Sequence, residues 1–461
     1  MKTSSSVYLF CAILSLVLYH LAPEQPSELF QVVCVLLFLA QSYFVVRSDI
    51  RKYGILNFNI LFLFSFFMVT YAFPLFLIGT TMENKEGIEA YIDFNVSCKC
   101  SALCTFAISI YFWAYKMYRK KMVDFSTLVN KFGTLSINIF FFLISIILYY
   151  ATITHLQEDG GVAVHSGYWY SLYLACLPLC LVLNCRKYQV RNLSQYVLRN
   201  ILILIPAFIL FFLYFIIGDR GLIIVSGVMM AATYSVMVKR IRPTFLIVGI
   251  IVGSLLMYAV RETRSSEASL SSGNTSGFVR GVEGSLSDAS AISIFADLTG
   301  IHRELYIGYD YVRHYGLIEP GQIAIVPFYP IPLLPNVLSQ ALFGKSMNDI
   351  KPGMVLNDFM SYTGHGHFGI HCVIDVYMRW GLLGVVFFFY LWGYIVASIT
   401  KYQKKNLMGV VLYIVLIASA ISMPRQPLVD ILRTYAYVII LAWLSGLLGG
   451  KQQRLSIKKF V

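Results

Sequence analysis

Long apolar runs recur along this chain and restrict its fold more than any other feature. Each run is close to the ~20 residues that a helix needs to cross the hydrocarbon core of a bilayer. Because lipid offers no hydrogen-bond partner to an open sheet edge, such runs predict helices. We expect an all-α polytopic membrane protein with about 12 spanning helices, at Val7–Ala22, Leu29–Val46, Ile55–Gly79, Lys99–Tyr118, Thr134–Thr154, Tyr168–Cys185, Asn200–Ile217, Leu222–Val238, Pro243–Val260, Val373–Ile399, Leu407–Met423 and Ile431–Gly449.

The composition agrees with this expectation and excludes a soluble globular domain. Hydrophobic residues make up 58% of the 461 residues and charged residues only 13%, which is too few to cover a surface that faces water. The formal net charge of +13 comes from lysines and arginines that are concentrated in alternate loops. This segregation indicates membrane orientation and contact with anionic lipids, so we expect no nucleic-acid partner.

The basic residues predict how the helices are oriented. Cytoplasmic loops of membrane proteins carry an excess of Lys and Arg. With the N-terminus inside, both termini are cytoplasmic, and the first apolar run, which lacks a small-residue cleavage site, is a span and not a signal peptide. The predicted inner segments contain Lys2; Arg47, Arg51, Lys52; Lys116, Arg119, Lys120, Lys121, Lys131; Arg186, Lys187, Arg191, Arg199; Lys239, Arg240, Arg242; Lys401, Lys404, Lys405; and Lys451, Arg454, Lys458, Lys459.

A long polar insert between the ninth and tenth predicted spans divides the chain. We expect helices 1–9 in residues 1–260, a large outer loop in 261–372 and helices 10–12 in 373–461. In the insert, Ala289–Tyr315 has a helical pattern, whereas Val326–Pro335 is too proline-rich for a helix and apolar enough to lie along the bilayer interface. Cationic and imidazole side chains of the insert predict an anionic substrate; they are Arg261, Arg264, Arg280, Arg303, Arg313, His302, His314, His365 and His367.

Arginines near the bilayer are functional candidates. Such a side chain is unfavourable unless it pairs or lines a wet cavity, which draws attention to Arg220, Arg379 and Arg425. Purely structural roles stay open as well. Arg220 follows Asp219 at a helix end, where snorkelling or a local ion pair would explain its presence. Arg379 follows Asp375 by one helical turn, where an i,i+4 ion pair would explain its presence. As a binding group, guanidinium grips two phosphate oxygens at once, and several such groups can replace a metal ion.

Histidines of the insert are candidates for a general base. His365 and His367 carry imidazoles, which can accept a proton from an attacking sugar hydroxyl near neutral pH. A metal site is the alternative, because these two residues and His371 have ligand-like spacing and Asp358 and Asp375 could complete the set. The surrounding arginines would repel a divalent cation. We therefore expect no metal.

Three stretches, with the order of the parts, give the chain a likeness to a known family. They are the short turn Gly218–Gly221 between two apolar runs, the late insert with its segment Val326–Pro335, and Asp375–Gly384, which has the pattern acidic-x-Tyr-x-x-aromatic-Gly-x-x-Gly at the entry to the next helix. In these features, and over nearly its whole length, the chain resembles the O-antigen polymerase (Wzy) family of bacterial inner-membrane proteins. The resemblance implies a GT-C-like arrangement with one large periplasmic loop between helices 9 and 10.

The resemblance also implies an activity. These proteins are glycosyltransferases that join oligosaccharide repeat units carried on undecaprenyl pyrophosphate, without a metal or nucleotide cofactor, for O-antigen and lipopolysaccharide biosynthesis. Implied partners are undecaprenyl-pyrophosphate-linked oligosaccharides, membrane lipids and a protein that regulates chain length. Arginines would hold the lipid pyrophosphate and a histidine would activate the acceptor. The expected catalytic residues are His365, His367 and Arg220, and the expected pyrophosphate-binding residues are Arg264, Arg303, Arg313 and Arg425.

Other functions stay open beside this one. O-antigen ligases share the fold and an Arg/Arg/His site but transfer the glycan to another acceptor. A polysaccharide transporter or flippase should show paired repeats and broken helices at mid-membrane, and an acyltransferase a histidine on a buried helix; this sequence instead concentrates its cations in one outer insert. The sequence contains no GxxxxGK[ST] or GxSxG motif, which gives no support to an ATP-driven pump or a serine hydrolase.

Overall fold

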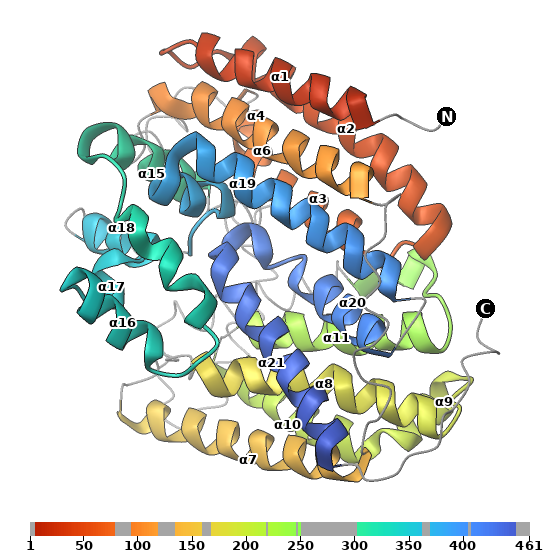
Figure 1. The fold of residues 1–461 in the computed structure, drawn as a ribbon. Coiled ribbons are helices and arrows are strands. Elements are labelled where there is room, and N and C mark those ends of the chain that lie inside the picture. Colours follow the sequence, from red (N-terminus) through yellow and green to blue (C-terminus); the bar gives the residue numbers. More distant parts are fainter. Residues whose placement is uncertain are drawn as a thin grey trace, which may run out of the picture. The chain divides into compact units, whose positions relative to one another are not determined.

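The computed structural model describes residues 5–78, 94–118, 134–158, 167–217, 220–245, 248–249, 302–361, 369–403 and 407–448. Every regular element in these ranges is a helix, mostly α-helical with a few short 3₁₀ segments and one π-helical turn (Figure 1). The expected all-α class is therefore confirmed for the described part of the chain.

The described helices include several that can cross a membrane. Six are long and apolar enough, and α9 with α10, bent by 83° at their junction, makes a seventh if the pair is one broken span. Shorter apolar helices cover four further predicted spans. The ninth predicted span, Pro243–Val260, lies mostly outside the described residues, so the number of about 12 stays a prediction. The six are Glu28–Tyr53, Phe58–Leu75, Ser97–Tyr118, Ile137–Thr154, Tyr168–Lys187 and Cys372–Tyr402.

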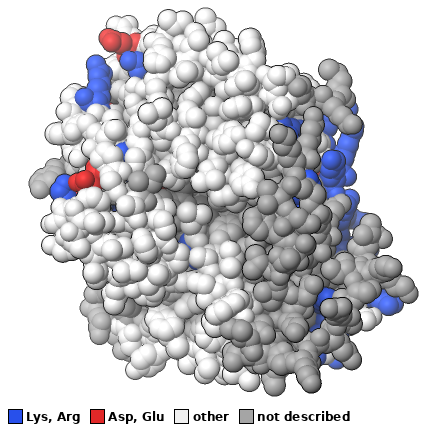
Figure 2. Space-filling view, in the orientation of Figure 1, with Lys and Arg blue, Asp and Glu red and all other residues white. Residues whose placement is uncertain are grey.

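The surface agrees with a membrane environment. Large apolar side chains are exposed along whole helix faces, such as Phe10 at 65%, Leu36 at 60% and Leu202 at 80%. On the face drawn in Figure 2, most of the described surface is uncharged, and charged side chains occur in a few groups. Continuous apolar faces of this size have to meet lipid or another apolar surface.

The helices group into two compact units, and each unit is built from three segments that are separated in the sequence. Unit 1 comprises residues 1–122, 290–398 and 419–432; unit 2 comprises 123–289, 399–418 and 433–461. Unit 1 contains α1 (Ser5–Leu21), α2 (Glu28–Tyr53), α3 (Phe58–Phe67), the π-helix η1 (Met68–Ala72), α4 (Phe73–Ile78), η2 (Phe94–Val96), α6 (Ser97–Tyr118), α15 (His302–Tyr315), η4 (Pro320–Ala324), η5 (Val326–Phe328), α16 (Leu334–Phe343), α17 (Met347–Ile350), α18 (Pro352–Ser361), most of α19 (Cys372–Tyr402) and η6 (Met423–Arg425).

Unit 2 contains the remaining helices: α7 (Thr134–Glu158), α8 (Gly167–Lys187), α9 (Leu193–Arg199), α10 (Ile201–Ile217), α11 (Arg220–Met237), α20 (Leu407–Ser419) and most of α21 (Leu428–Leu448). Helix α8 packs against α7 and α11, and α10 packs against α7 and α11. Helix α10 ends at Ile217 and α11 begins at Arg220, so Gly218 and Asp219 of the expected turn Gly218–Gly221 lie outside the described residues.

Helix α6 is the centre of unit 1. It packs against α1 and α2 and is buried on nearly all sides, with small residues such as Ala102, Ala107 and Ala114 at 0% exposure. Small side chains let helices approach closely in a membrane, where packing replaces the hydrophobic driving force. The backbone of Tyr111 and that of Gly393 on α19 illustrate this, because a Cβ at Gly393 would lie 2.4 Å from the Tyr111 carbonyl oxygen.

A buried polar network closes one end of unit 1. Asp49, 1% exposed near the end of α2, accepts hydrogen bonds from Asn59 Nδ2 (2.6 Å) and from the Tyr115 hydroxyl (2.8 Å). The Tyr111 hydroxyl in turn donates to Asn59. A carboxylate in such surroundings requires these donors. This end also holds the basic residues Arg51 and Lys52 in the last turn of α2.

The described part of the insert forms a layer of short helices. A small core of Ile325, Tyr329, Met347 and Ile350 holds η4, η5, α16 and α17 together. The expectation that Val326–Pro335 avoids helix is right only for its middle. Val326–Phe328 is a short 3₁₀ segment and Pro335 lies in the first turn of α16, where a missing N–H is tolerated.

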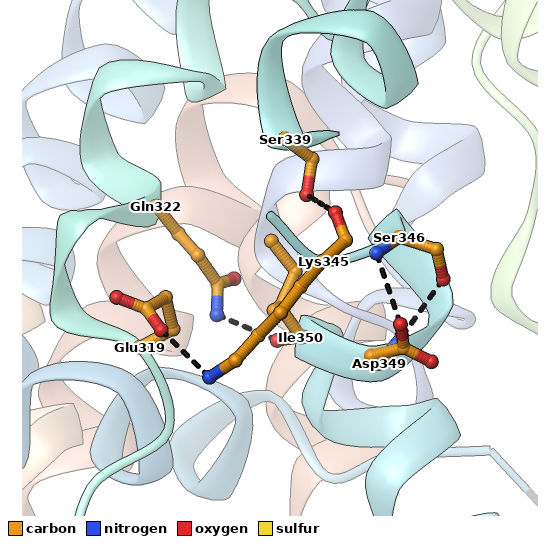
Figure 3. Close-up of polar contacts among 7 residues, drawn as sticks. All are labelled: Glu319, Gln322, Ser339, Lys345, Ser346, Asp349 and Ile350. Atoms are coloured by element: carbon orange, nitrogen blue, oxygen red, sulfur yellow. Dashed lines mark hydrogen bonds and ion pairs between the residues drawn. The ribbon is translucent and has the colours of Figure 1, made fainter. Parts of the chain in front are cut away.

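Local hydrogen bonds explain where these short helices begin and end (Figure 3). Gly344 ends α16 in the left-handed conformation, which favours glycine. Ser346 and Asp349 then form a reciprocal capping box that starts α17. Across the layer, Ser339 Oγ donates to the carbonyl of Lys345 and Gln322 Nε2 to the carbonyl of Ile350, at 2.7 and 2.6 Å.

Candidate functional site

One end of unit 1 contains several of the polar side chains that the sequence draws attention to. We call it the α15 end. It contains α15, the last turn of α1, and the first turns of α2, α6 and α19. Hydrogen bonds join these elements: Ser27 N donates to Cys98 Sγ (3.3 Å) and the Cys100 thiol to the carbonyl of Leu305 (3.7 Å).

Helix α15 is held by packing of its apolar side. Leu305 and Tyr306 are buried, and Gly308 lies so close to α19 that an added Cβ would be 2.6 Å from Ile374 Cγ1. At its first residue, the ring of His302 stacks on Phe73 with centroids 3.6 Å apart. His302 is 4% exposed. It therefore packs in the interior. The sequence had led us to expect His302 in an open cationic basin, and this expectation is wrong for this residue.

Two of the predicted pyrophosphate ligands lie on this helix. Arg303 is half-buried in the first turn and Arg313 is exposed near the last turn. Arg313 is ten positions after Arg303, which corresponds to about 15 Å along the helix axis. His314 next to Arg313 is exposed and lies 3.3 Å from Asp310 Oδ1. The two arginines are thus placed at opposite ends of α15, and Arg303 is the one beside the spanning helices.

The level of the membrane at the α15 end can be inferred from α19. Residues 381–400 carry no charge and are flanked by Arg379 and Lys401. At 1.5 Å per residue this stretch is about 30 Å long, the thickness of the hydrocarbon core. Phe73, on which the ring of His302 stacks, begins α4, and this apolar helix continues to Ile78. The first turn of α15, with Arg303, therefore lies beside an apolar helix.

The entry to α19 is held by a buried ion pair. Arg379 is 1% exposed and donates from Nη2 and Nε to Asp375 Oδ1, at 3.0 and 3.2 Å. Its Nη1 donates to Gln322 Oε1, and Gln322 continues the chain of bonds to the carbonyl of Ile350. The i,i+4 pair expected from the sequence is thus confirmed. Through Gln322 it also fastens the insert to α19.

The rest of the Asp375–Gly384 motif has a structural explanation. Trp380 Nε1 donates to the carbonyl of Pro320 at 2.7 Å, and Ile318 N donates to the carbonyl of Met378 at 2.8 Å. Gly381 has φ 60° and ψ −152°, a conformation that is open to glycine and strained for other residues. Gly384 leaves room for the Cβ of Trp380, which would lie 2.5 Å from an added Cβ. The motif therefore builds the joint between insert and helix.

A cluster of three tyrosines joins α1, α15 and α19 at the same end. The Tyr19 hydroxyl lies 3.0 Å from the hydroxyls of both Tyr309 and Tyr377. The rings of Tyr309 and Tyr377 stack with centroids 5.3 Å apart. Burial raises the pKa of Tyr309, so its hydroxyl stays protonated and remains able to donate. Tyr377 is the half-buried member of the cluster.

His371 is locked in the neutral state next to the π-helical turn. Its Nδ1 accepts from Val373 N (3.3 Å), so the proton of the neutral ring is on Nε2, which lies 2.9 Å from Thr70 Oγ1. Burial lowers the pKa of His371 to about 3. With one nitrogen engaged by the backbone and the other protonated, the ring positions α19 against η1 and has no lone pair for a substrate proton.

The remaining predicted site residues have different placements. His365, His367 and Arg264 lie outside the described residues. Arg220 begins α11 in unit 2. Arg425 is half-buried in η6, which packs against α3, where Ser65 Oγ donates to the carbonyl of Ile421 at 2.6 Å.

The metal-site alternative finds no support in the described residues. Within the part of the chain that the structure describes, no group of three or more His, Cys, Asp and Glu side chains is arranged to hold a metal ion. His371 and Asp375 of the alternative ligand set are instead engaged with Thr70 and Arg379.

Reasoning from the sequence missed Tyr19 of the α15 end and two residues that contact the entry to its α19, Gln322 and Thr70. Thr70 is a polar residue within an apolar run, and this is a usable signal, because a buried hydroxyl needs a partner. Gln322 and Tyr19 carry no comparable signal. A scan of protein-family models and searches of curated proteins and of solved structures find no match for this chain.

Proposed function

We propose that this chain is a membrane glycosyltransferase that polymerises undecaprenyl-pyrophosphate-linked oligosaccharide repeat units into O-antigen or a related surface polysaccharide. The observation that supports this proposal most is the position of Arg303. It is half-buried on a helix of the insert, next to His302, whose ring stacks on Phe73 of an apolar helix. A lipid pyrophosphate carries its charge directly above its hydrocarbon chain, so an arginine that binds it has to lie beside apolar helices. The likeness of the sequence to O-antigen polymerases points to the same substrate.

The distribution of charge within unit 1 supports a periplasmic location of the α15 end. Among the described residues of the opposite end, Arg47, Arg51, Lys52 and Lys116 accompany one acid, Asp49. At the α15 end, acidic residues such as Glu28, Glu304 and Asp310 are mixed with the basic ones. Because the side rich in Lys and Arg is usually cytoplasmic, we propose an inner-membrane protein with about 12 spans and cytoplasmic termini.

The proposed reaction moves the glycan from one lipid to another. The acceptor hydroxyl forms a bond to the anomeric carbon of the donor glycan, and the bond between that carbon and the pyrophosphate oxygen breaks. The hydroxyl proton goes to a histidine, with His365 and His367 as the proposed bases, and undecaprenyl pyrophosphate leaves with the bonding electrons. A guanidinium such as that of Arg303 stabilises the charge on the departing pyrophosphate.

Product analysis tests this proposal. Purified protein in nanodiscs is incubated with a lipid-pyrophosphate oligosaccharide, and products are separated by length. A ladder of multiples of the repeat unit is the expected result. A single transfer product on a different acceptor would assign the chain to ligase-type transfer, and movement of the lipid-linked substrate across the bilayer without a new glycosidic bond would assign it to a transporter or flippase.

A further inference from the structure

An apolar patch is exposed on the insert layer. It consists of five side chains from η5, the turn after it and α16: Phe328 (39% exposed), Ile331 (48%), Leu333 (72%), Val337 (60%) and Leu342 (57%). We call this set the 328–342 patch. Its residues are exposed, whereas Ile325, Tyr329, Met347 and Ile350 of the same layer are buried in the small core.

One residue of the patch, Leu333, has a strained backbone conformation. Leu333 has φ 63° and ψ −27°, the left-handed conformation, at the residue before α16. For a non-glycine residue this conformation is strained. The most exposed side chain of the patch therefore belongs to a strained residue. Burial of Leu333 in an apolar medium would offset that strain.

The patch is attached to the part of α19 that marks the membrane boundary. Trp380 and Arg379, at the start of the uncharged stretch 381–400, bind Pro320 and Gln322. Between these two, an added Cβ at Gly321 would lie 2.8 Å from the ring of Phe343, the last residue of α16. The C-terminal end of α16 is thus one side-chain contact away from the hydrocarbon boundary.

The neighbouring surface is also apolar and exposed. Leu317, 45% exposed, lies 4.0 Å from the position of an added Cβ at Gly381, the first residue of the uncharged stretch. Further into that stretch, Leu383 is 83% exposed and Phe387 is 54% exposed. The exposed apolar surface of α19 therefore continues across Leu317 to the insert.

Two charged residues, Lys345 and Glu319, lie next to the patch. Lys345, just after α16, pairs with Glu319 at 3.1 Å (Figure 3), and its side chain remains 54% exposed. A basic side chain beside an apolar face is typical of a segment that lies in the headgroup region, where the amine reaches lipid phosphates.

We propose that the 328–342 patch dips into the bilayer interface, so that η5 and α16 form a monotopic element that lies on the membrane beside α19. Its occupant is lipid: the acyl chains and glycerol backbone of the adjacent leaflet. The proposal rests on the membrane character of the chain and is independent of the proposed glycosyl transfer, because it concerns a surface on which no step of that reaction depends.

Site-directed spin labelling tests the proposal on the full chain in nanodiscs. Nitroxides are placed singly by Leu333→Cys, Val337→Cys and Leu342→Cys, with Lys239→Cys, at an exposed polar residue in the loop after α11, as the water-accessible control. Of the native cysteines, all but Cys11 are buried. We expect relaxation by apolar oxygen to exceed relaxation by a water-soluble nickel complex several-fold at the patch positions, and the reverse at position 239.

Three outcomes would overturn the proposal. Equal and high access of the nickel complex at positions 337 and 239 would mean that the patch faces water. Dipolar broadening between labels at position 337 would mean that a second copy of the chain covers it. Low access of both reagents without broadening would mean that another protein surface covers it. Leu333 and Leu342 labels keep the test valid if the Val337→Cys variant fails to fold.

Discussion

Arg379 donates two hydrogen bonds to a single oxygen of Asp375, with Nη2 at 3.0 Å and Nε at 3.2 Å, and both side chains are shielded from solvent. The pair neutralises two charges one helical turn before the uncharged stretch of α19 begins. It also leaves Nη1 of Arg379 for Gln322 of the insert. Charge neutralisation and attachment of the insert are thus achieved by the same guanidinium.

Removing the arginine of this pair should destabilise unit 1 strongly. Arg379→Met leaves the carboxylate of Asp375 buried without its partner, which costs about 3 to 5 kcal/mol. The double variant Asp375→Leu with Arg379→Met should cost less than the single variant, because no charge remains buried. Unfolding of the purified variants in mixed micelles measures both. Lys345→Ala, at an exposed pair, is the control and should change stability by less than about 1 kcal/mol. A double variant less stable than Arg379→Met would contradict this reasoning.

Stability should depend on pH through His371. Its pKa is lowered from 6.5 to about 3 in the folded protein, so between these values the unfolded chain binds a proton that the folded chain does not. The stabilisation is fully present above pH 6.5 and is lost as the pH falls, by about 2 kcal/mol between pH 6.5 and 5. His371→Gln retains a donor for Thr70 and should show a shallower loss over that interval. Equal slopes for the two proteins would show that His371 is accessible to protons in the folded state.

Close packing of α6 and α19 should make Gly393 intolerant of substitution. In Gly393→Ala the new methyl would lie 2.4 Å from the carbonyl oxygen of Tyr111 and 2.9 Å from Cβ of Ala114. The two helices must separate, which we expect to cost about 1 to 3 kcal/mol or more. Gly227→Ala in α11 is the matched control, because nothing lies within 4 Å of its added Cβ. That variant should be neutral or more stable by up to about 1 kcal/mol, and a similar loss in both variants would refute the packing argument.

If the proposed function is right, the two arginines of α15 should differ in importance. Arg303→Ala should reduce polymer formation by about 100-fold or more, as loss of a single transition-state donor does elsewhere. Arg303→Lys should restore only part, because an ammonium group cannot grip two oxygens at once. Arg313→Ala, at the exposed far end of the helix, should have a smaller effect. Polymer length and yield are compared at equal protein abundance; equal losses at the two positions would contradict the assignment of Arg303.

Several features of the fold could be predicted from the sequence because they depend on neighbours along the chain. Apolar runs of sufficient length predicted the long helices, including Ser97–Tyr118 and Cys372–Tyr402. The spacing of Asp375 and Arg379 predicted their ion pair, since residues four apart share one face of a helix. The helical pattern up to Tyr315 predicted α15, although part of the expected range, 289–301, lies outside the described residues.

The candidate site was less predictable. His302 looked like a member of a cationic basin, and only its stacking on Phe73 shows that it belongs to the interior. His371 looked like a possible base or ligand, until its two nitrogens were seen to contact Val373 and Thr70. A sequence lists which side chains can take or give protons, but burial and partners decide whether they do.

The sequence by itself determined that this chain builds apolar helices and that Asp375 and Arg379 meet, because hydrophobic period and helical spacing act over a few residues. Only the tertiary structure decided that Gln322 binds Arg379 across 57 residues and that Tyr19 binds Tyr309 across 290. Such contacts arise when distant segments pack around α6 and α19. Their partners are therefore selected by shape and by the need to satisfy buried polar groups, and neither leaves a pattern along the chain.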